Sequence, residues 1–71
     1  MMPLNLATTG EESLIRHIGG SLEVRKHLEY LGFVVGGEVT VVSAIGGNII
    51  VKVKESRVAI SDEMARRIMI S

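Results

Sequence analysis

One stretch of 17 residues, Arg25–Val41 (RKHLEYLGFVVGGEVTV), restricts the possible folds of this chain more than any other feature. It reads as an amphipathic helix, a glycine stop, a turn and then a β-strand. At about 100° per residue, Val24, Leu28 and Leu31 fall within one narrow stripe of a helix, while the charged residues around them lie elsewhere. This pattern predicts a helix that packs one apolar side against a β-sheet.

Both ends of the predicted helix carry local signals. Ser21 is a good N-cap, because its hydroxyl can accept a hydrogen bond from a free amide of the first turn. At the other end, Gly32 can adopt positive φ without a Cβ clash. Phe33 then falls at the position that contacts Leu28 in a Schellman ending. We predict a helix over Leu22 to Leu31.

Length and composition predict a single small domain spanning residues 1–71. Apolar residues make up 46 % of the chain, and Tyr30 and Phe33 are its only aromatic residues. There is no cysteine, which excludes disulfides and thiolate metal sites. Eight basic residues balance eight acidic ones, whereas nucleic-acid binders normally have a basic excess. No apolar run reaches the roughly 18 residues that span a bilayer, and no signal peptide is evident.

Further strands are predicted on either side of the helix. Ser13 to Ile18 reads as a strand with Ile15 and Ile18 in the core, and their spacing of three residues indicates a β-bulge. Glu38–Ile45 and Ile49–Lys54 read as a hairpin.

The apolar pattern favours a three-residue hairpin loop, Gly46-Gly47-Asn48, with Asn48 in the left-handed region. This register places Ile45 opposite Ile49, Ser43 opposite Val51 and Val41 opposite Val53. Val39, Val41, Val51 and Val53 then face the core, and Thr40, Lys52 and Lys54 face water.

The C-terminal part predicts a short strand at Arg57–Ile60, a helical turn capped by Ser61, and a last strand at Ile68–Ile70. About five short strands, tight turns and one helix suggest a mainly β fold. A small barrel is expected, because closing the sheet removes its exposed edges.

Several short patterns in this order resemble the ferrous iron transport protein A (FeoA) family over essentially the whole chain. They are Pro3-Leu4, Gly10-Glu11, Gly19-Gly20, Arg25 with Leu28, Leu31-Gly32-Phe33, Gly36, Glu38-Val39, Val51-Lys52-Val53 and Arg57-Val58-Ala59-Ile60. The resemblance implies an SH3-like β-barrel with a helical insertion after an early strand. It also implies a non-enzymatic cytoplasmic accessory protein of bacterial ferrous iron uptake, recruited to the inner face of the membrane by the transporter FeoB, which has a GTP-binding domain.

The sequence offers no catalytic, cofactor or metal site. His17 and His27 lie on separate predicted elements, and a metal site needs three or more converging side chains. No serine has a recognisable base and orienting acid near it, so we expect no enzyme. We expect no resident cofactor and at most weak binding of ferrous iron. Gly19-Gly20-Ser21 is interpreted as a turn and a cap, because it lacks the lysine of a phosphate loop.

One surface is a candidate for binding a partner. Leu22, Lys26 and Tyr30 are four residues apart and lie on the side of the helix away from its core stripe. Tyrosine is favoured at interfaces, so these three residues are predicted to contact a protein partner. Two other functions stay open: a metal- or peptide-binding sensor module, related to the C-terminal SH3-like domain of iron-dependent repressors, and a small nucleic-acid-binding barrel.

Overall fold

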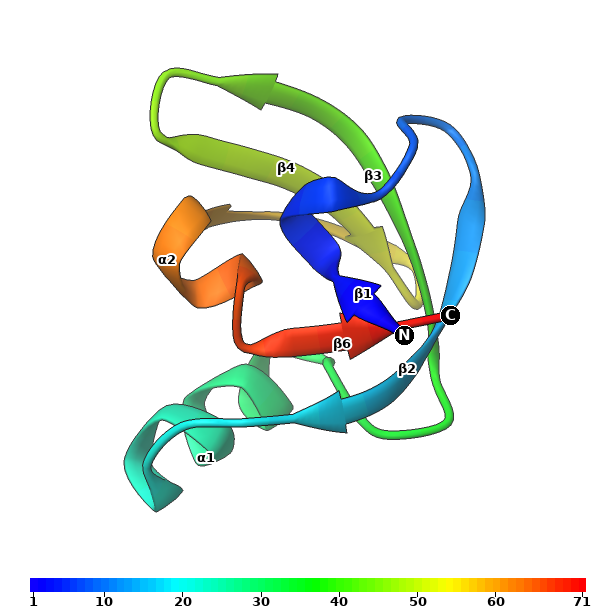
Figure 1. Cartoon of the computed structure of the whole chain (residues 1–71). Helices are drawn as coiled ribbons and strands as arrows, with labels where there is room; N and C mark the ends of the chain where they lie inside the picture. Colours follow the sequence, from blue (N-terminus) through cyan, green and yellow to red (C-terminus); the bar gives the residue numbers. More distant parts are fainter.

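The fold is a single curved antiparallel sheet with one helix across its end (Figure 1). The computed structural model describes residues 1–71. In chain order the elements are β1 (Met2–Pro3), a short 3-10 helix (Leu4–Leu6), β2 (Glu12–Ile18), α1 (Leu22–Leu31), β3 (Glu38–Ile45), β4 (Asn48–Val53), β5 (Ser56–Ser61), α2 (Asp62–Ala65) and β6 (Ile68–Ile70). Helix α1 follows the early strand β2, as predicted.

The six strands lie in the order β1-β6-β2-β3-β4-β5. The sheet wraps into a barrel-like shape but does not close, because β1 and β5 are edge strands with no hydrogen bonds to each other. The predicted fold class is confirmed, with six strands where about five were expected and with a sheet that is barrel-like but not closed. Strand β1 has only two residues, one of them a proline that cannot donate to the ladder, so it carries no strand pattern in the sequence.

The core is entirely apolar. Its 13 buried residues are Leu4, Ile15, Leu28, Phe33, Val39, Val41, Ile49, Val51, Val53, Ile60, Ala65, Ile68 and Ile70. Every strand from β2 to β6, both α-helices and the 3-10 helix contribute to this list. The core is therefore one cluster that ties the N-terminal segment to the last strand.

Helix α1 begins and ends where the sequence predicts. The Ser21 hydroxyl accepts from the Val24 amide at 3.2 Å. Gly32 has φ 109°, its amide donates to the Glu29 carbonyl, and the Phe33 amide donates to the Leu28 carbonyl at 2.9 Å. These two bonds form the predicted Schellman ending, which turns Phe33 back into the core.

The β3–β4 hairpin has a different register from the predicted one. Ile45 pairs with Asn48, so the loop is the two residues Gly46-Gly47, and Ser43 pairs with Ile50. Gly46 takes the left-handed conformation at φ 60°, and Asn48 does not. Ile45, predicted to face the core, is 65 % exposed at the end of the strand.

A β-bulge explains why the predicted inward and outward faces of the hairpin are correct although the predicted register is not. The register shifts at Val42, so that Val41 pairs with Val51 and Val39 with Val53. All four valines are buried, as predicted. Lys52 and Lys54 are exposed as predicted, and Thr40 is half-buried on the outer face. The bulge adds one residue to β3 and so returns the valines to the core face, although their cross-strand partners differ from the predicted ones.

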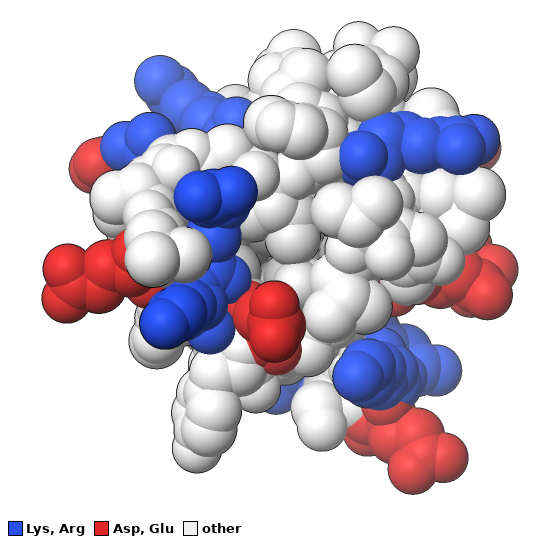
Figure 2. Space-filling model, turned by 90° about the horizontal axis from the view of Figure 1, so that it is seen from below, with Lys and Arg blue, Asp and Glu red and all other residues white.

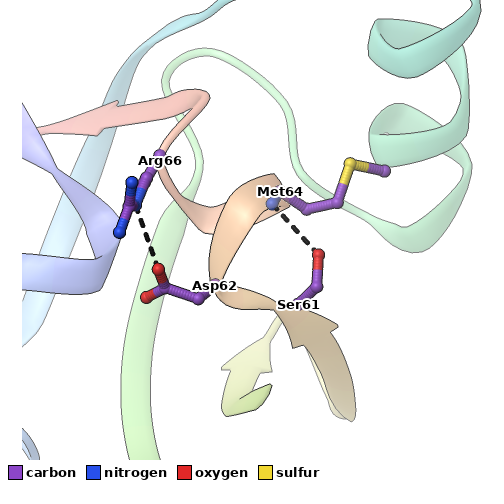
Figure 3. A network of polar contacts seen from close by, with 4 residues as sticks. All are labelled: Ser61, Asp62, Met64 and Arg66. Atoms are coloured by element: carbon purple, nitrogen blue, oxygen red, sulfur yellow. Dashed lines mark hydrogen bonds and ion pairs between the residues drawn. The ribbon is translucent and has the colours of Figure 1, made fainter. Parts of the chain in front are cut away.

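The predicted bulge in β2 is present. The pairing with β6 shifts between Ile15 and His17, which buries Ile15 fully and leaves Ile18 half-buried against the core. The short helix α2 is capped as predicted: the Met64 amide donates to the Ser61 hydroxyl at 3.1 Å (Figure 3). Arg66 donates to Asp62 across one turn of the same helix at 3.0 Å (Figure 3).

Candidate functional site

The outward side of α1 is set by the way the helix packs. Leu28 is fully buried, and Val24 and Leu31 lie against the core, so the opposite side of the helix faces solvent. Tyr30 is 86 % exposed and Leu22 is 60 % exposed. Lys26 is exposed between them in the sequence. The structure therefore places all three predicted partner-binding residues on the surface.

A groove runs beside α1 and has a volume of about 450 Å³. It is lined by apolar and charged side chains from α1, the end of β2 and the turn after the helix: Ile18, Leu22, Arg25, Lys26, Glu29, Phe33, Val34 and Val35. The groove brings Leu22 and Lys26 together but does not include Tyr30. The predicted set is thus split between a groove wall and a separate part of the helix surface.

Sequence reasoning missed the contribution of the turn after α1. Val34 and Val35 are part of the groove lining, and Val35 is 64 % exposed. The available signal was two valines directly after the buried Phe33, in a turn that ends with Gly36 at φ 90°. The sequence does not show which distant residues these valines lie near. Only the fold shows that they line the same groove as Leu22.

The charges of the groove have no partners within the chain. The two ion pairs of the structure both join α2 to the residues directly after it, between Asp62 and Arg66 and between Glu63 and Arg67. Arg25 and Lys26 therefore form no ion pair. Figure 2 looks from below at the side on which α1 lies in Figure 1 and shows separate basic and acidic groups around uncharged surface.

A second hollow of about 340 Å³ lies on the outer face of β2, β3 and β4. Its lining is Glu12, Glu38, Thr40, Lys52 and Lys54. Glu12 pairs with Thr40 in the sheet, two residue pairs from the pair that contains Glu38. A side-chain hydrogen bond to Glu38, together with repulsion between the two carboxylates, raises the pKa of Glu12 above its ordinary value.

The histidines lie apart. His17 is on β2 and His27 is on α1, and both are exposed. No group of three or more histidine, aspartate and glutamate side chains converges on a point where a metal ion could bind. No helix of the structure is long and apolar enough to cross a membrane.

Comparison with known proteins relates the whole chain to one family. Residues 2–71 match the family model of the FeoA domain. The Fe(2+) transport protein A of Methanocaldococcus jannaschii is 30 % identical over 70 residues, which are 99 % of this chain and 85 % of that protein. The crystal structure of an iron uptake regulatory protein (FeoA) superposes with a TM-score of 0.90 at 28 % identity, covering 99 % of this chain and 93 % of that one.

More distant structures share the fold alone. The FeoA of Stenotrophomonas maltophilia, a prokaryotic SH3 domain protein crystallised with zinc, has a TM-score of 0.86 at 23 % identity over 100 % of this chain and 91 % of its own. A manganese-dependent transcriptional repressor has a TM-score of 0.87 at 15 % identity and matches over 96 % of this chain and 39 % of its own. The fold is thus the SH3-like barrel that the sequence predicts, and the chain belongs to the FeoA family of ferrous iron transport proteins.

Proposed function

We propose that this protein is a non-enzymatic cytoplasmic accessory of ferrous iron uptake that binds the cytoplasmic part of the membrane transporter FeoB. Membership of the FeoA family supplies the link to ferrous iron transport. The observation that carries the proposal is the surface of α1, where Leu22 and Tyr30 are largely exposed among charged side chains such as Arg25, Lys26 and Glu29. Residues 1–71 would act as one domain, recruited to the inner face of the membrane by its partner.

The proposed surface has the chemistry of a protein interface. Tyrosine offers a large apolar ring with a polar tip, and it is enriched at interfaces relative to the rest of a protein surface. Leu22 and Lys26 add an apolar contact and a positive charge on the same side of the helix. Association through such a surface is expected to be modest in affinity and to weaken at high salt.

A protein without catalytic groups can still change the activity of a transporter. It does so by binding one conformational state of the transporter more tightly than another, and its effect is limited by the difference between the two affinities. No nucleic acid or resident cofactor is part of this proposal. Ferrous iron is the cargo of the transporter, and the accessory protein acts on the transporter.

Capture of the transporter tests the proposal. The purified protein is immobilised and incubated with membranes that contain the transporter, or with transporter in detergent. Wild type is expected to retain it, Leu22→Ala and Tyr30→Ala to retain less, and Lys26→Glu to show an altered salt dependence. Thermal unfolding of each variant serves as the control for folding. Equal capture by all three variants would place the interface elsewhere, and no capture by wild type would contradict the proposal.

A further inference from the structure

We infer that the groove beside α1 binds an acidic segment of the protein partner, with an apolar side chain of that segment against Leu22 and Val35 and a carboxylate on Arg25 or Lys26. This inference rests on the proposed function and specifies the chemistry of the partner at the same surface. It adds Val35 and Arg25 to the interface, neither of which the sequence pattern of α1 identifies.

The groove presents exposed apolar side chains to a partner. Leu22 and Val35 both line the groove and are largely exposed, whereas Phe33, which also lines it, is fully buried. An apolar anchor of a partner that contacts both exposed side chains would desolvate them together, which is how anchor residues in pockets contribute most of the energy of an interface.

Two basic residues of the groove form no ion pair within the chain. Arg25 and Lys26 line the groove, and neither has an acidic partner within the chain. Both side chains are exposed and carry donors, and a guanidinium can hold a carboxylate in a bidentate pair. Glu29 is the one acidic residue of the lining, so the groove keeps a net positive charge. These charges favour an acidic partner segment over a basic one.

The same features argue against a flat lipid surface as the occupant. A bilayer would contact the exposed side chains of Leu22 and Val35 but would not fill a groove of about 450 Å³. Glu29 would also be repelled by the anionic headgroups that attract Arg25 and Lys26. A polypeptide segment can fill the groove with one side chain and place its own carboxylates away from Glu29.

Affinity for the detergent-solubilised transporter tests the groove with matched variants. Val35→Glu and Ile45→Glu introduce the same charge at aliphatic residues of nearly equal exposure, 64 % and 65 %, but only Val35 lines the groove. Arg25→Glu is matched by Arg57→Glu, an exposed arginine on β5. We expect Val35→Glu and Arg25→Glu to raise Kd by about tenfold or more and the two controls by less than about twofold.

Carbodiimide coupling tests the acidity of the partner segment. The reagent activates a carboxylate, which then forms an amide bond with a lysine amine in direct contact. Lys26 is expected to couple to an aspartate or glutamate of the transporter. Lys26→Arg is expected to bind normally and to lose the cross-link, because it keeps the charge without the amine. Lys52 and Lys54 line the other hollow, on the outer face of the sheet, and are expected not to couple.

The outcomes separate the inference from the proposed function. If wild type binds the transporter and Val35→Glu binds as well as Ile45→Glu, or if only Lys52 or Lys54 couples, the groove is not the binding site and the accessory function stands. If wild type does not bind the transporter but floats with vesicles containing anionic phosphatidylglycerol, the inference is overturned in favour of a lipid surface. If it binds neither, both the inference and the proposed function fail.

Discussion

The Phe33 amide donates a 2.9 Å hydrogen bond to the Leu28 carbonyl, and both side chains are fully buried in the core. This pairing couples the end of α1 to the barrel. The turn that follows contributes Val34 and Val35 to the lining of the groove, together with Leu22 of the helix. The local chemistry of a helix ending therefore determines the position of the candidate binding surface.

The conformation of Gly32 makes this ending sensitive to substitution. Gly32 has φ 109°, and a Cβ there would lie 3.6 Å from the Val53 methyl groups. We expect Gly32→Val to lower the free energy of unfolding by more than about 1 kcal/mol, because a β-branched residue is strained at positive φ. Denaturant titration measures the change.

Gly47→Ala is the matched control, since Gly47 has no positive φ and no atom within 4 Å of an added Cβ. A neutral Gly32→Val variant would show that this ending does not depend on the left-handed residue.

Alanine substitutions on the inward and outward faces of the hairpin are expected to destabilise the protein by different amounts. Val51 is fully buried at the centre of the core, whereas Thr40 is half-buried on the outer face. Val51→Ala is expected to destabilise the protein by about 1–3 kcal/mol, through lost apolar burial and a residual cavity. Thr40→Ala should cost much less. Equal costs in chemical denaturation would contradict the burial of these faces.

The carboxyl pair on the outer face predicts a dependence on pH. The pKa of Glu12 is raised by its hydrogen bond to Glu38 and by repulsion from that carboxylate. The folded state therefore holds the Glu12 proton more strongly than the unfolded state does. The resulting stabilisation is present at acidic pH, below the unfolded pKa, and is lost as pH rises through the raised pKa of the folded state. Glu12→Gln removes the titration.

We therefore expect the Tm of Glu12→Gln to gain on that of the wild type as pH rises from about 4 to about 7. Scanning calorimetry at several pH values measures the difference. Glu11→Gln removes a neighbouring carboxylate outside the hollow and controls for the change in net charge. A constant difference across this range would mean that Glu12 and Glu38 do not interact in solution.

The metal prediction concerns the isolated protein. Because no three donor side chains converge, we expect titration with ferrous, zinc or manganese ions under anaerobic conditions to give no stoichiometric tight binding. Calorimetry and NMR shifts follow the titration. Shifts at micromolar metal that converge on His17 or His27 and a neighbouring acidic residue would contradict it.

Features governed by neighbouring residues could be predicted from the sequence. The bounds of α1, its Ser21 cap and the bulge in β2 all follow from short-range patterns and agree with the structure. The hairpin register could not be predicted, because a two-residue loop with a bulge at Val42 and a three-residue loop without one both bury the valines. Alternation of apolar residues does not distinguish these two solutions.

The candidate site could be predicted only in part, for a related reason. Leu22, Lys26 and Tyr30 share one side of a helix, which helical periodicity specifies. The groove also needs the turn after α1, and its distance from Leu22 is set by tertiary packing. Periodicity therefore identified Leu22 and Lys26 of the groove lining, missed Val35, and included Tyr30, which lies outside the groove.

Uptake of ferrous iron tests the central claim most directly. Cells that express the transporter at a fixed level, with no other copy of this protein, are supplied anaerobically with radiolabelled ferrous iron. The account predicts that wild-type protein increases the initial rate of uptake. It also predicts that the Leu22→Ala/Tyr30→Ala double variant, present in equal amount and folded, gives a smaller increase. Uptake that is the same with and without the wild-type protein would contradict a role as an accessory of ferrous iron transport.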